Sequence, residues 1–335
     1  MTKWNLIRST RLHKVFKPFY SGIGHVLIFH RITDENDCVF NRNIQIPPDY
    51  LEEIIEYFID NNIDIVTLDE CYDRITSEGK MKRFVAFTFD DGYADNLVNA
   101  LPVFEKYNAP FTLFLATGFP DHSIILWWYL LEDLVLHSDR IEFEDGDDTY
   151  FFDTITQDEK KEAFWKIRSY IVESNEDNLL LRLKNIFNKS ENELLDLTKK
   201  LALTWDQVVE LSNHPLVAIG AHTVSHMALS KLKENKVIEE INESIRIIED
   251  KIKKPVHHLA YPIGSYSAAN IREFNITEKC NVKMAFTARD GNIFRHHANH
   301  LYSLPRIGID ETRGLTFIDL YINGFTPFLN KIIGK

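Results

Sequence analysis

The sequence predicts an α/β fold with a mainly parallel sheet. Short apolar runs typical of buried strands alternate with helical patterns, the alternation recurs in both halves of the chain, and polar motifs directly follow several runs. With 335 residues, 44% of them hydrophobic, the chain can build a large core. Periodicity alone does not distinguish a closed barrel from an open sheet. In both, functional residues gather at the carboxyl ends of the strands.

The elements of the first half follow in a regular order. Residues 25–30 (HVLIFH) are typical of a buried strand, and Pro47 and Pro48 open a helix with apolar residues at helical spacing. The next predicted elements are strands at residues 64–67, 84–89 (FVAFTF) and 111–116 (FTLFLA), with a helix across residues 102–107.

The pattern breaks at about residues 121–204, which we interpret as a largely helical insertion. The acidic run 142–148 is typical of a hairpin or loop, and helical stretches follow at 160–172 and 178–187. Alternation resumes after this region. It predicts helices at 205–212, behind a capping box, and at 236–253, with strands at 216–220, 259–261, 285–287 and 304–308.

We therefore expect one domain over residues 23–335, carrying the insertion and preceded by a basic amphipathic segment, residues 1–22. Basic residues alternate there with bulky apolar ones; they are Lys3, Arg8, Arg11, Lys14 and Lys17. A packed terminal helix with a solvated basic face is the simpler interpretation. The alternative is a segment that lies flat on an anionic membrane.

Charge and hydropathy narrow the class of protein. A formal net charge of -12 argues against a nucleic-acid partner, because phosphate binding requires a basic field. The sequence has neither a transmembrane-length apolar stretch nor the apolar core of a signal peptide, which predicts a cytoplasmic location. If residues 1–22 bind lipid, the protein would be peripheral at the inner membrane face.

Three motifs follow predicted strands. In residues 88–92 (TFDDG), two adjacent carboxylates on an irregular turn after the strand can point in different directions, so that one binds a metal ion and the other stays free as a base. The alternative is a turn without a functional role. In residues 222–226 (HTVSH), two histidines four apart would share one helical face and one metal ion, unless they are a surface pair. Residues 260–264 (AYPIG) are by themselves only a turn.

Together the motifs supply one carboxylate and two imidazoles for a metal ion, with a second carboxylate beside them. Three protein ligands leave a position for water, which is typical of a catalytic metal site rather than a structural one. Such an ion lowers the pKa of water and polarises a carbonyl, and the free carboxylate acts as general base.

The order, spacing and strand context of these motifs resemble the polysaccharide deacetylase family. The resemblance covers roughly residues 23–120 and 204–310 and leaves the insertion unexplained. It implies a distorted (β/α) barrel of about seven strands and one divalent metal ion, most often zinc, with cobalt or nickel also accepted.

The resemblance also implies roles for individual residues. Asp90 would be the catalytic base, and the metal ligands would be Asp91, His222 and His226. The family's third motif usually reads Arg-Pro-Pro-Tyr-Gly, but this chain has Ala260 in place of the Arg and Ile263 in place of the Tyr. The backbone N–H of Ile263 is then our candidate for stabilising the oxyanion.

Two residues of the family pattern, the Arg that orients the catalytic base and the His that acts as general acid, are missing from their usual motifs. Arg306, after a late predicted strand, is the candidate to orient the catalytic base in place of the missing Arg. The family's Leu-x-His motif, which supplies the general acid, is not evident. We favour His30 for this role, and the alternatives are His122, His296, His297 and His300.

The resemblance implies removal of an N-acetyl group from a sugar in a glycan or glycan precursor, in bacterial surface polysaccharide synthesis. A lipid- or nucleotide-linked sugar is the expected substrate. One alternative is an O-acetyl esterase or N-deformylase, because the same chemistry serves all three, and another is a catalytically silent carbohydrate-binding protein. The aromatic run 127–129 favours core packing, with a lid that stacks on sugar rings as the alternative.

Overall fold

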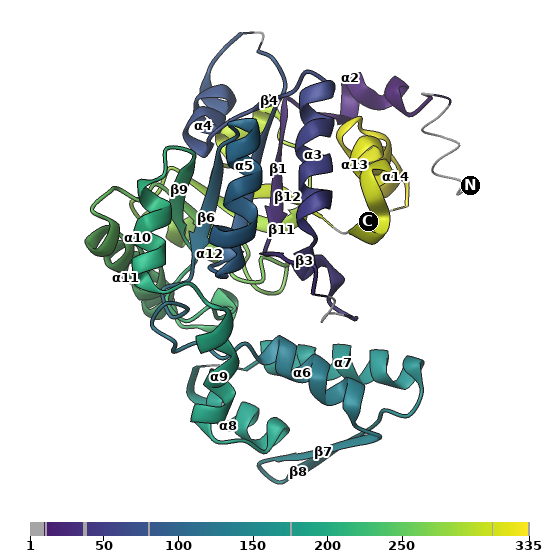
Figure 1. Ribbon diagram of the computed structural model, residues 1–335, viewed down its shortest axis with the longest axis vertical. Helices are drawn as coiled ribbons and strands as arrows, with labels where there is room; N and C mark the ends of the chain where they lie inside the picture. Colours follow the sequence, from purple (N-terminus) through teal and green to yellow (C-terminus); the bar gives the residue numbers. More distant parts are fainter. Residues whose placement is uncertain are drawn as a thin grey trace.

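Seven parallel strands close into a barrel surrounded by helices (Figure 1). The computed structural model describes residues 10, 12–35, 39–79, 81–174, 176–309 and 311–333. The barrel order is β1-β12-β11-β10-β9-β6-β5, and the pairing of β1 with β5 closes it. The predicted α/β fold, with a distorted barrel of about seven strands, is confirmed.

The barrel strands coincide with apolar runs of the sequence. They are β1 (Gly24–Phe29), β5 (Phe84–Asp91), β6 (Phe111–Leu115), β9 (Val217–Ala221), β10 (His258–Ala260), β11 (Met284–Asp290) and β12 (Leu304–Gly308). All eight residues of β5 are buried, as expected for a strand covered on both faces. The predicted strand at 64–67 is the short β4 (Asp64–Ile65), which pairs with the start of β5 outside the closed ring.

Alternate residues of the strands fill two separate layers. Inward-facing side chains such as Val26, Ala86 and Phe286 form a core inside the barrel. Outward-facing ones such as Leu27 and Phe87 pack against the surrounding helices. Those helices are α3 (Pro48–Asp60), α4 (Leu68–Thr76), α5 (Leu101–Tyr107), α10 (Trp205–Asn213), α11 (Glu234–Ile252), α12 (Ile271–Thr277) and α13 (Gly314–Ile322).

The chain between β6 and β9 forms a unit with its own apolar core. Its elements are α6 (Trp127–His137), the antiparallel hairpin of β7 (Arg140–Asp145) and β8 (Asp148–Asp153), α7 (Gln157–Val172), α8 (Glu176–Phe187) and α9 (Glu191–Leu201). Figure 1 shows this unit below the barrel, at the end toward which the arrow of β1 points. It therefore lies at the carboxyl ends of the barrel strands.

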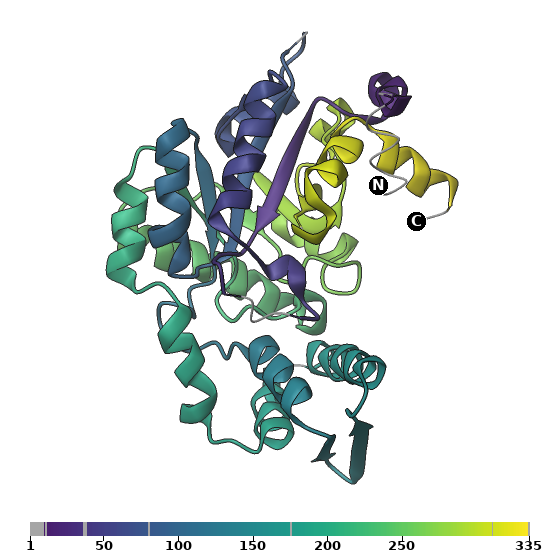
Figure 2. The same cartoon turned by 45° about the vertical axis from the view of Figure 1, so that its right-hand side comes forward.

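The first and last helices that the structure describes lie side by side at the edge of the molecule (Figure 2). The short helices η1 (Leu12–Phe16) and α2 (Lys17–Tyr20) contact α14 (Phe325–Ile332), where the rings of Phe16 and Phe328 stack with centroids 4.2 Å apart. Of the predicted segment 1–22, residues 1–9 and 11 lie outside the described residues. Among the described helices, none has the length and apolar character needed to cross a bilayer.

Candidate active site

Asp90 and Arg306 form a buried ion pair at the carboxyl end of the barrel. Side chains alternate along a strand, so Asp90 follows Ala86 and Thr88 on the inward face of β5, and Arg306 follows Leu304 on that of β12. The two terminal nitrogens of the guanidinium donate to the two carboxylate oxygens, each at 2.6 Å. This fork-to-fork geometry fixes the orientation of the carboxylate.

The ion pair also sets the charge of Asp90. Burial acts to raise the pKa of this carboxyl, but the Arg306 charge and hydrogen bonds outweigh burial and hold the pKa below its ordinary value. Arg306 is itself held by Oγ1 of Thr88 at 3.1 Å and by the carbonyl of Thr287 at 3.0 Å. Asp90 is therefore an ionised, oriented carboxylate that can accept a proton.

Asp91, His222 and His226 bring three possible metal-ligand atoms within 4.8 Å of one another. Oδ1 of Asp91 lies 3.0 Å from Nε2 of His226 and 3.5 Å from Nε2 of His222. It is buried, yet no described group makes a well-aligned hydrogen bond to it. His222 directs Nδ1 to the carbonyl of Ala260 at 2.8 Å, which leaves Nε2 free as a ligand. Two nitrogens and one carboxylate oxygen fit a divalent ion such as zinc.

The two adjacent aspartates end the strand β5, whereas the sequence predicted that they lie on a turn after it. Asp91 has a φ of 80°, which turns its side chain out of the strand alternation. Gly92 follows with a φ of 118°, and a Cβ there would lie 2.5 Å from Cδ1 of Leu115. This kink explains how neighbouring carboxylates face different partners, Arg306 for Asp90 and the histidines for Asp91.

His222 and His226 lie on a loop, so the prediction of a shared helical face was wrong. Thr223 and His226 have positive φ values of 66° and 57°, which interrupt any helix directly after β9. Glu240, buried on α11, accepts hydrogen bonds from the N–H groups of Val224 and Ser225, both at 2.9 Å. The loop geometry, rather than helical periodicity, sets the distance between the two imidazoles.

Ile263 holds an unusual backbone conformation at the edge of the site. Its φ is 63°, which is rare for a β-branched residue and costs on the order of 1–3 kcal/mol. Among the described residues, nothing accepts a hydrogen bond from its N–H, and the residue lines the same cavity as Asp90 and Asp91. The strained peptide thus offers a free donor at the site.

His30 is the candidate general acid that reaches the site. It directly follows β1, and its Nδ1 is buried without a hydrogen-bond partner among the described residues. Burial lowers the pKa of His30, although the charges of Asp91 and Asp90 oppose this shift. The imidazole therefore lies within electrostatic reach of both carboxylates.

The other candidate histidines lie elsewhere. His296, His297 and His300 surround the helical turn η5 (Arg295–Asn299), which packs against α4. The chain just before this turn pairs with Gly24, at the amino end of β1, so these three are at the opposite end of the barrel. His122 lies in the turn after β6 and does not line the site cavity.

The candidate residues line a cavity of about 150 Å³, except Arg306, which lies beneath Asp90. The unit between β6 and β9 completes its wall with Trp127 and Trp128 of α6 and Arg168 of α7. Trp128 donates to the hydroxyl of Tyr93 at 3.1 Å and faces the ring of the predicted ligand His226, with centroids 5.4 Å apart. The aromatic run therefore packs in a core and also borders the site.

Sequence reasoning missed Arg168, although a signal was present. On α7 the buried side chains of Phe164, Ile167 and Ile171 recur at helical spacing, and Arg168 lies on the same stripe. A cation that shares the apolar stripe of a helix indicates a partly buried charge.

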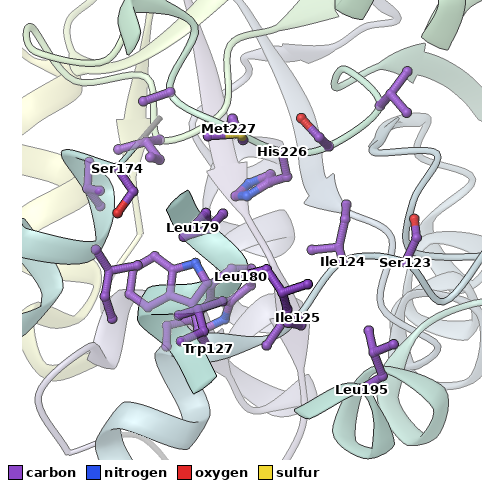
Figure 3. Close-up of a pocket in the computed structure, with 18 of the residues that line it drawn as sticks. Ser123, Ile124, Ile125, Trp127, Ser174, Leu179, Leu180, Leu195, His226 and Met227 are labelled. Atoms are coloured by element: carbon purple, nitrogen blue, oxygen red, sulfur yellow. The ribbon is translucent and has the colours of Figure 1, made fainter. Parts of the chain in front are cut away.

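A second, mainly apolar cavity of about 240 Å³ adjoins the first (Figure 3). Both cavities share Trp127, Trp128, His226 and Ile263. Figure 3 shows the imidazole of His226 among apolar side chains of the second cavity, which include Leu179 and Met227. One predicted metal ligand thus separates a polar cavity from an apolar one.

Comparisons with known proteins identify the family of this chain. The sequence model of the polysaccharide deacetylase family matches residues 77–285, more than half of the chain. The protein YxkH of Bacillus subtilis (strain 168) is 20% identical over 298 residues, which are 89% of this chain and 75% of that relative.

Solved structures share the fold. Streptococcus pyogenes deacetylase PplD, solved in complex with acetate, superposes with a TM-score of 0.58 at 18% identity, covering 89% of this chain and 97% of that one. IcaB from Ammonifex degensii gives a TM-score of 0.57 at 15% identity, covering 91% and 98%. The similarity of fold thus extends over most of the chain.

Proposed function

Because this chain belongs to the polysaccharide deacetylase family, we propose that it hydrolyses an N-acetyl group on a sugar of a glycan or glycan precursor. The observation that carries this proposal is the position of the ion-paired Asp90 beside the cluster of Asp91, His222 and His226. A base and a set of metal ligands at the carboxyl ends of barrel strands support metal-assisted hydrolysis.

Each residue has a proposed task. Asp91, His222 and His226 would hold a divalent ion, most often zinc in this family, with cobalt or nickel as alternatives. When bound, such an ion polarises the amide carbonyl and lowers the pKa of a nearby water molecule. Asp90, held ionised by Arg306, accepts the proton of that water as its oxygen attacks the carbonyl carbon.

The remaining residues complete the reaction. The N–H of Ile263 donates a hydrogen bond to the carbonyl oxygen as negative charge develops on it. His30 gives a proton to the leaving nitrogen when the C–N bond breaks. The products are acetate and a sugar with a free amine, so that one water molecule is consumed in each turnover.

We also propose a cellular setting, bacterial surface polysaccharide synthesis on a lipid- or nucleotide-linked sugar at the cytoplasmic face of the membrane. In the described part of residues 1–22, Val15 and Phe19 are 66% and 76% exposed, and the neighbouring Lys14 is basic, which supports peripheral membrane contact. Co-sedimentation with anionic vesicles tests this, and binding that Phe19→Ser leaves unchanged would contradict it.

The proposed function is tested by measuring metal content together with acetate release from N-acetylated sugars. Wild type and Asp90→Asn should each hold one divalent ion per chain, whereas Asp91→Ala and His222→Ala should lose it. Acetate release should fall at least 100-fold in all three variants. His214→Ala, which removes an imidazole that is bonded to Glu105 outside the site, is the matched control and should behave as wild type.

The outcomes separate the alternatives. Release of formate, or of acetate from O-acetyl esters alone, would transfer the proposal to a deformylase or an esterase. A wild-type protein that takes up no metal even after reconstitution, and that binds glycans without turnover, would favour the silent carbohydrate-binding protein.

A further inference from the structure

Arg168 is a cation in the candidate site whose charge no described residue balances. Its side chain lines the cavity that also contains Asp90 and Asp91. Among the described residues, its one cation–π or polar interaction is with the face of Trp165, with the guanidinium carbon 5.5 Å from the ring centroid. By contrast Arg182, on the neighbouring helix α8, donates to the carboxylate of Asp145 at 3.0 Å.

The two aspartates of the cavity already have partners. Asp90 is neutralised by Arg306, and Asp91 faces His222 and His226. The charge of Arg168 is absent from the main influences on the pKa of either carboxyl. Among the described residues, therefore, none supplies the negative group that would balance Arg168.

The absence of a described partner matters because the guanidinium of Arg168 is partly buried. Burial lowers the pKa of Arg168, and no described group opposes the shift. A guanidinium remains charged in proteins nonetheless, so the fold bears the cost of partly desolvating an unpaired cation. The helix α7 turns this cation toward the cavity on the same stripe as Phe164 and Ile167, where an apolar side chain would pack without that cost.

The chemistry of the guanidinium defines the ligand. Its planar fork of N–H donors matches the paired oxygens of a phosphate or a carboxylate, and such charge-assisted bonds are about twice as strong as neutral ones. A sugar hydroxyl would hydrogen-bond to the fork but would leave its charge unbalanced. The cavity is therefore suited to an acylated sugar that carries its own negative charge.

We propose that Arg168 binds an anionic group of the substrate, a phosphate or a carboxylate, and so selects acidic sugar derivatives over neutral glycans. The inference deepens the proposed function and rests on it for the reaction. The binding itself is measurable without turnover, so the two can fail separately.

The test compares three probes on the metal-loaded enzyme, by calorimetric binding and by acetate release. They are methyl N-acetylglucosaminide, which is neutral, N-acetylglucosamine 1-phosphate and N-acetylmuramic acid, which carries a carboxylate. The variants are Arg168→Gln and Arg168→Lys. Lys166→Gln is the matched control, because it removes a positive charge from the same helix at a residue that is 61% exposed and paired with Glu162.

We expect wild type to bind at least one acidic probe about 10-fold or more tightly than the neutral one. Arg168→Gln should abolish this preference while leaving affinity for the neutral probe within about twofold. Arg168→Lys, which keeps the charge but not the fork, should retain part of the preference, and Lys166→Gln should retain all of it. The metal ion attracts anions in every variant, so the difference between variants isolates the guanidinium.

Equal wild-type affinity for all three probes would overturn the inference, as would an equal loss for neutral and acidic probes in Arg168→Gln. If Arg168→Gln does not fold, an undiminished acidic preference in Arg168→Lys contradicts bidentate recognition. Whichever acidic probe is preferred identifies a phosphate or a carboxylate. Tight binding of an acidic probe without acetate release would leave Arg168 as an anion site and contradict the proposed function instead.

Discussion

His25 and His30 occupy the two ends of strand β1, and their surroundings differ in one respect. At the amino end, Nδ1 of His25 lies 2.8 Å from Oδ1 of Asn292, and Nε2 lies 2.7 Å from a terminal nitrogen of Arg83. At the carboxyl end, Nδ1 of His30 is buried without a hydrogen-bond partner among the described residues. The oxygen Oδ1 of Asp91 also makes no well-aligned hydrogen bond, although it faces the imidazoles of His222 and His226.

This difference indicates that the polar groups at the amino end stabilise the fold, whereas those at the carboxyl end are available to bind a ligand or substrate. Around His25, the side-chain amide of Asn292 also donates to the carbonyls of Tyr20 and Tyr321, so the cluster fastens both terminal segments to the barrel. Each bond there stabilises the native state. Polar atoms left without partners at the carboxyl end reduce stability unless a ligand or substrate engages them. In a barrel of this type, chemistry therefore belongs at the carboxyl end and stability at the amino end.

Replacing His30 with Ala should produce the largest effect and should act on turnover alone. We expect the rate of acetate release to fall about 100-fold or more, as for loss of a general acid, with metal content unchanged. The free energy of unfolding should change by less than about 1 kcal/mol, because the lost imidazole nitrogen had no partner. Steady-state kinetics, elemental analysis and denaturant unfolding measure the three quantities. Turnover within twofold of wild type would remove His30 from the mechanism.

Replacing His25 with Ala should do the reverse. Loss of a fully buried imidazole and of both its hydrogen bonds should lower the free energy of unfolding by about 2–3 kcal/mol. Turnover per folded molecule should stay within about twofold of wild type. His137→Ala is the control, because that histidine is 75% exposed and its loss should change neither quantity. A His25 variant that is stable but inactive would break the comparison between the two ends.

The smallest expected effect concerns His297, also at the amino end. Burial, and then the neighbouring His296 and His300, lower the pKa of His297 to about 4, compared with about 6.5 in an unfolded chain. The native state therefore binds fewer protons between these values. The stability contributed by neutral His297 is complete above pH ~6.5 and is lost as the pH falls through this window toward 4.

The measurement compares denaturant unfolding of wild type and His297→Asn at pH 4.5 and pH 7. Wild type should lose about 1 kcal/mol more than the variant on acidification, a value already reduced for the partial exposure of this side chain. Asn can still accept the hydrogen bond that Nδ1 takes from the N–H of Phe294 at 3.1 Å. Equal losses in both proteins would show that His297 has no part in acid sensitivity.

The strands were predictable from the sequence because their burial is nearly complete. The run 84–89 has no polar residue except Thr88, and it forms all of β5 before Asp90 and Asp91. The boundaries were less predictable, since β5 continues through two aspartates that local propensity assigns to a turn. Closure of the barrel depends on the pairing of β1 with β5, a long-range contact that periodicity does not encode.

The site was predictable in residue type rather than in geometry. Adjacent aspartates and paired histidines can be recognised in the sequence by residue type. The contact between Arg306 and Asp90 follows from the alternation of side chains along β5 and β12, which places both on the inward face. The loop of His222 and His226 was mistaken for a helix because its support, Glu240, comes from a helix later in the chain. Arg168 was overlooked because a cation on a long helix is usually solvated, and only tertiary packing places it in the cavity.

The unit between β6 and β9 joins two strands that are neighbours in the barrel. At its exit, the N–H of Leu203 donates to the carbonyl of Gly92, one residue beyond Asp91, so the chain returns to the point near which it left. The entropy cost of closing such a connection rises only slowly with its length. Lengthening or exchanging the unit therefore costs little stability and leaves the register of the barrel strands unchanged. The region that supplies Arg168 could therefore be lengthened or exchanged without moving Asp91 on β5 or His222 and His226 after β9.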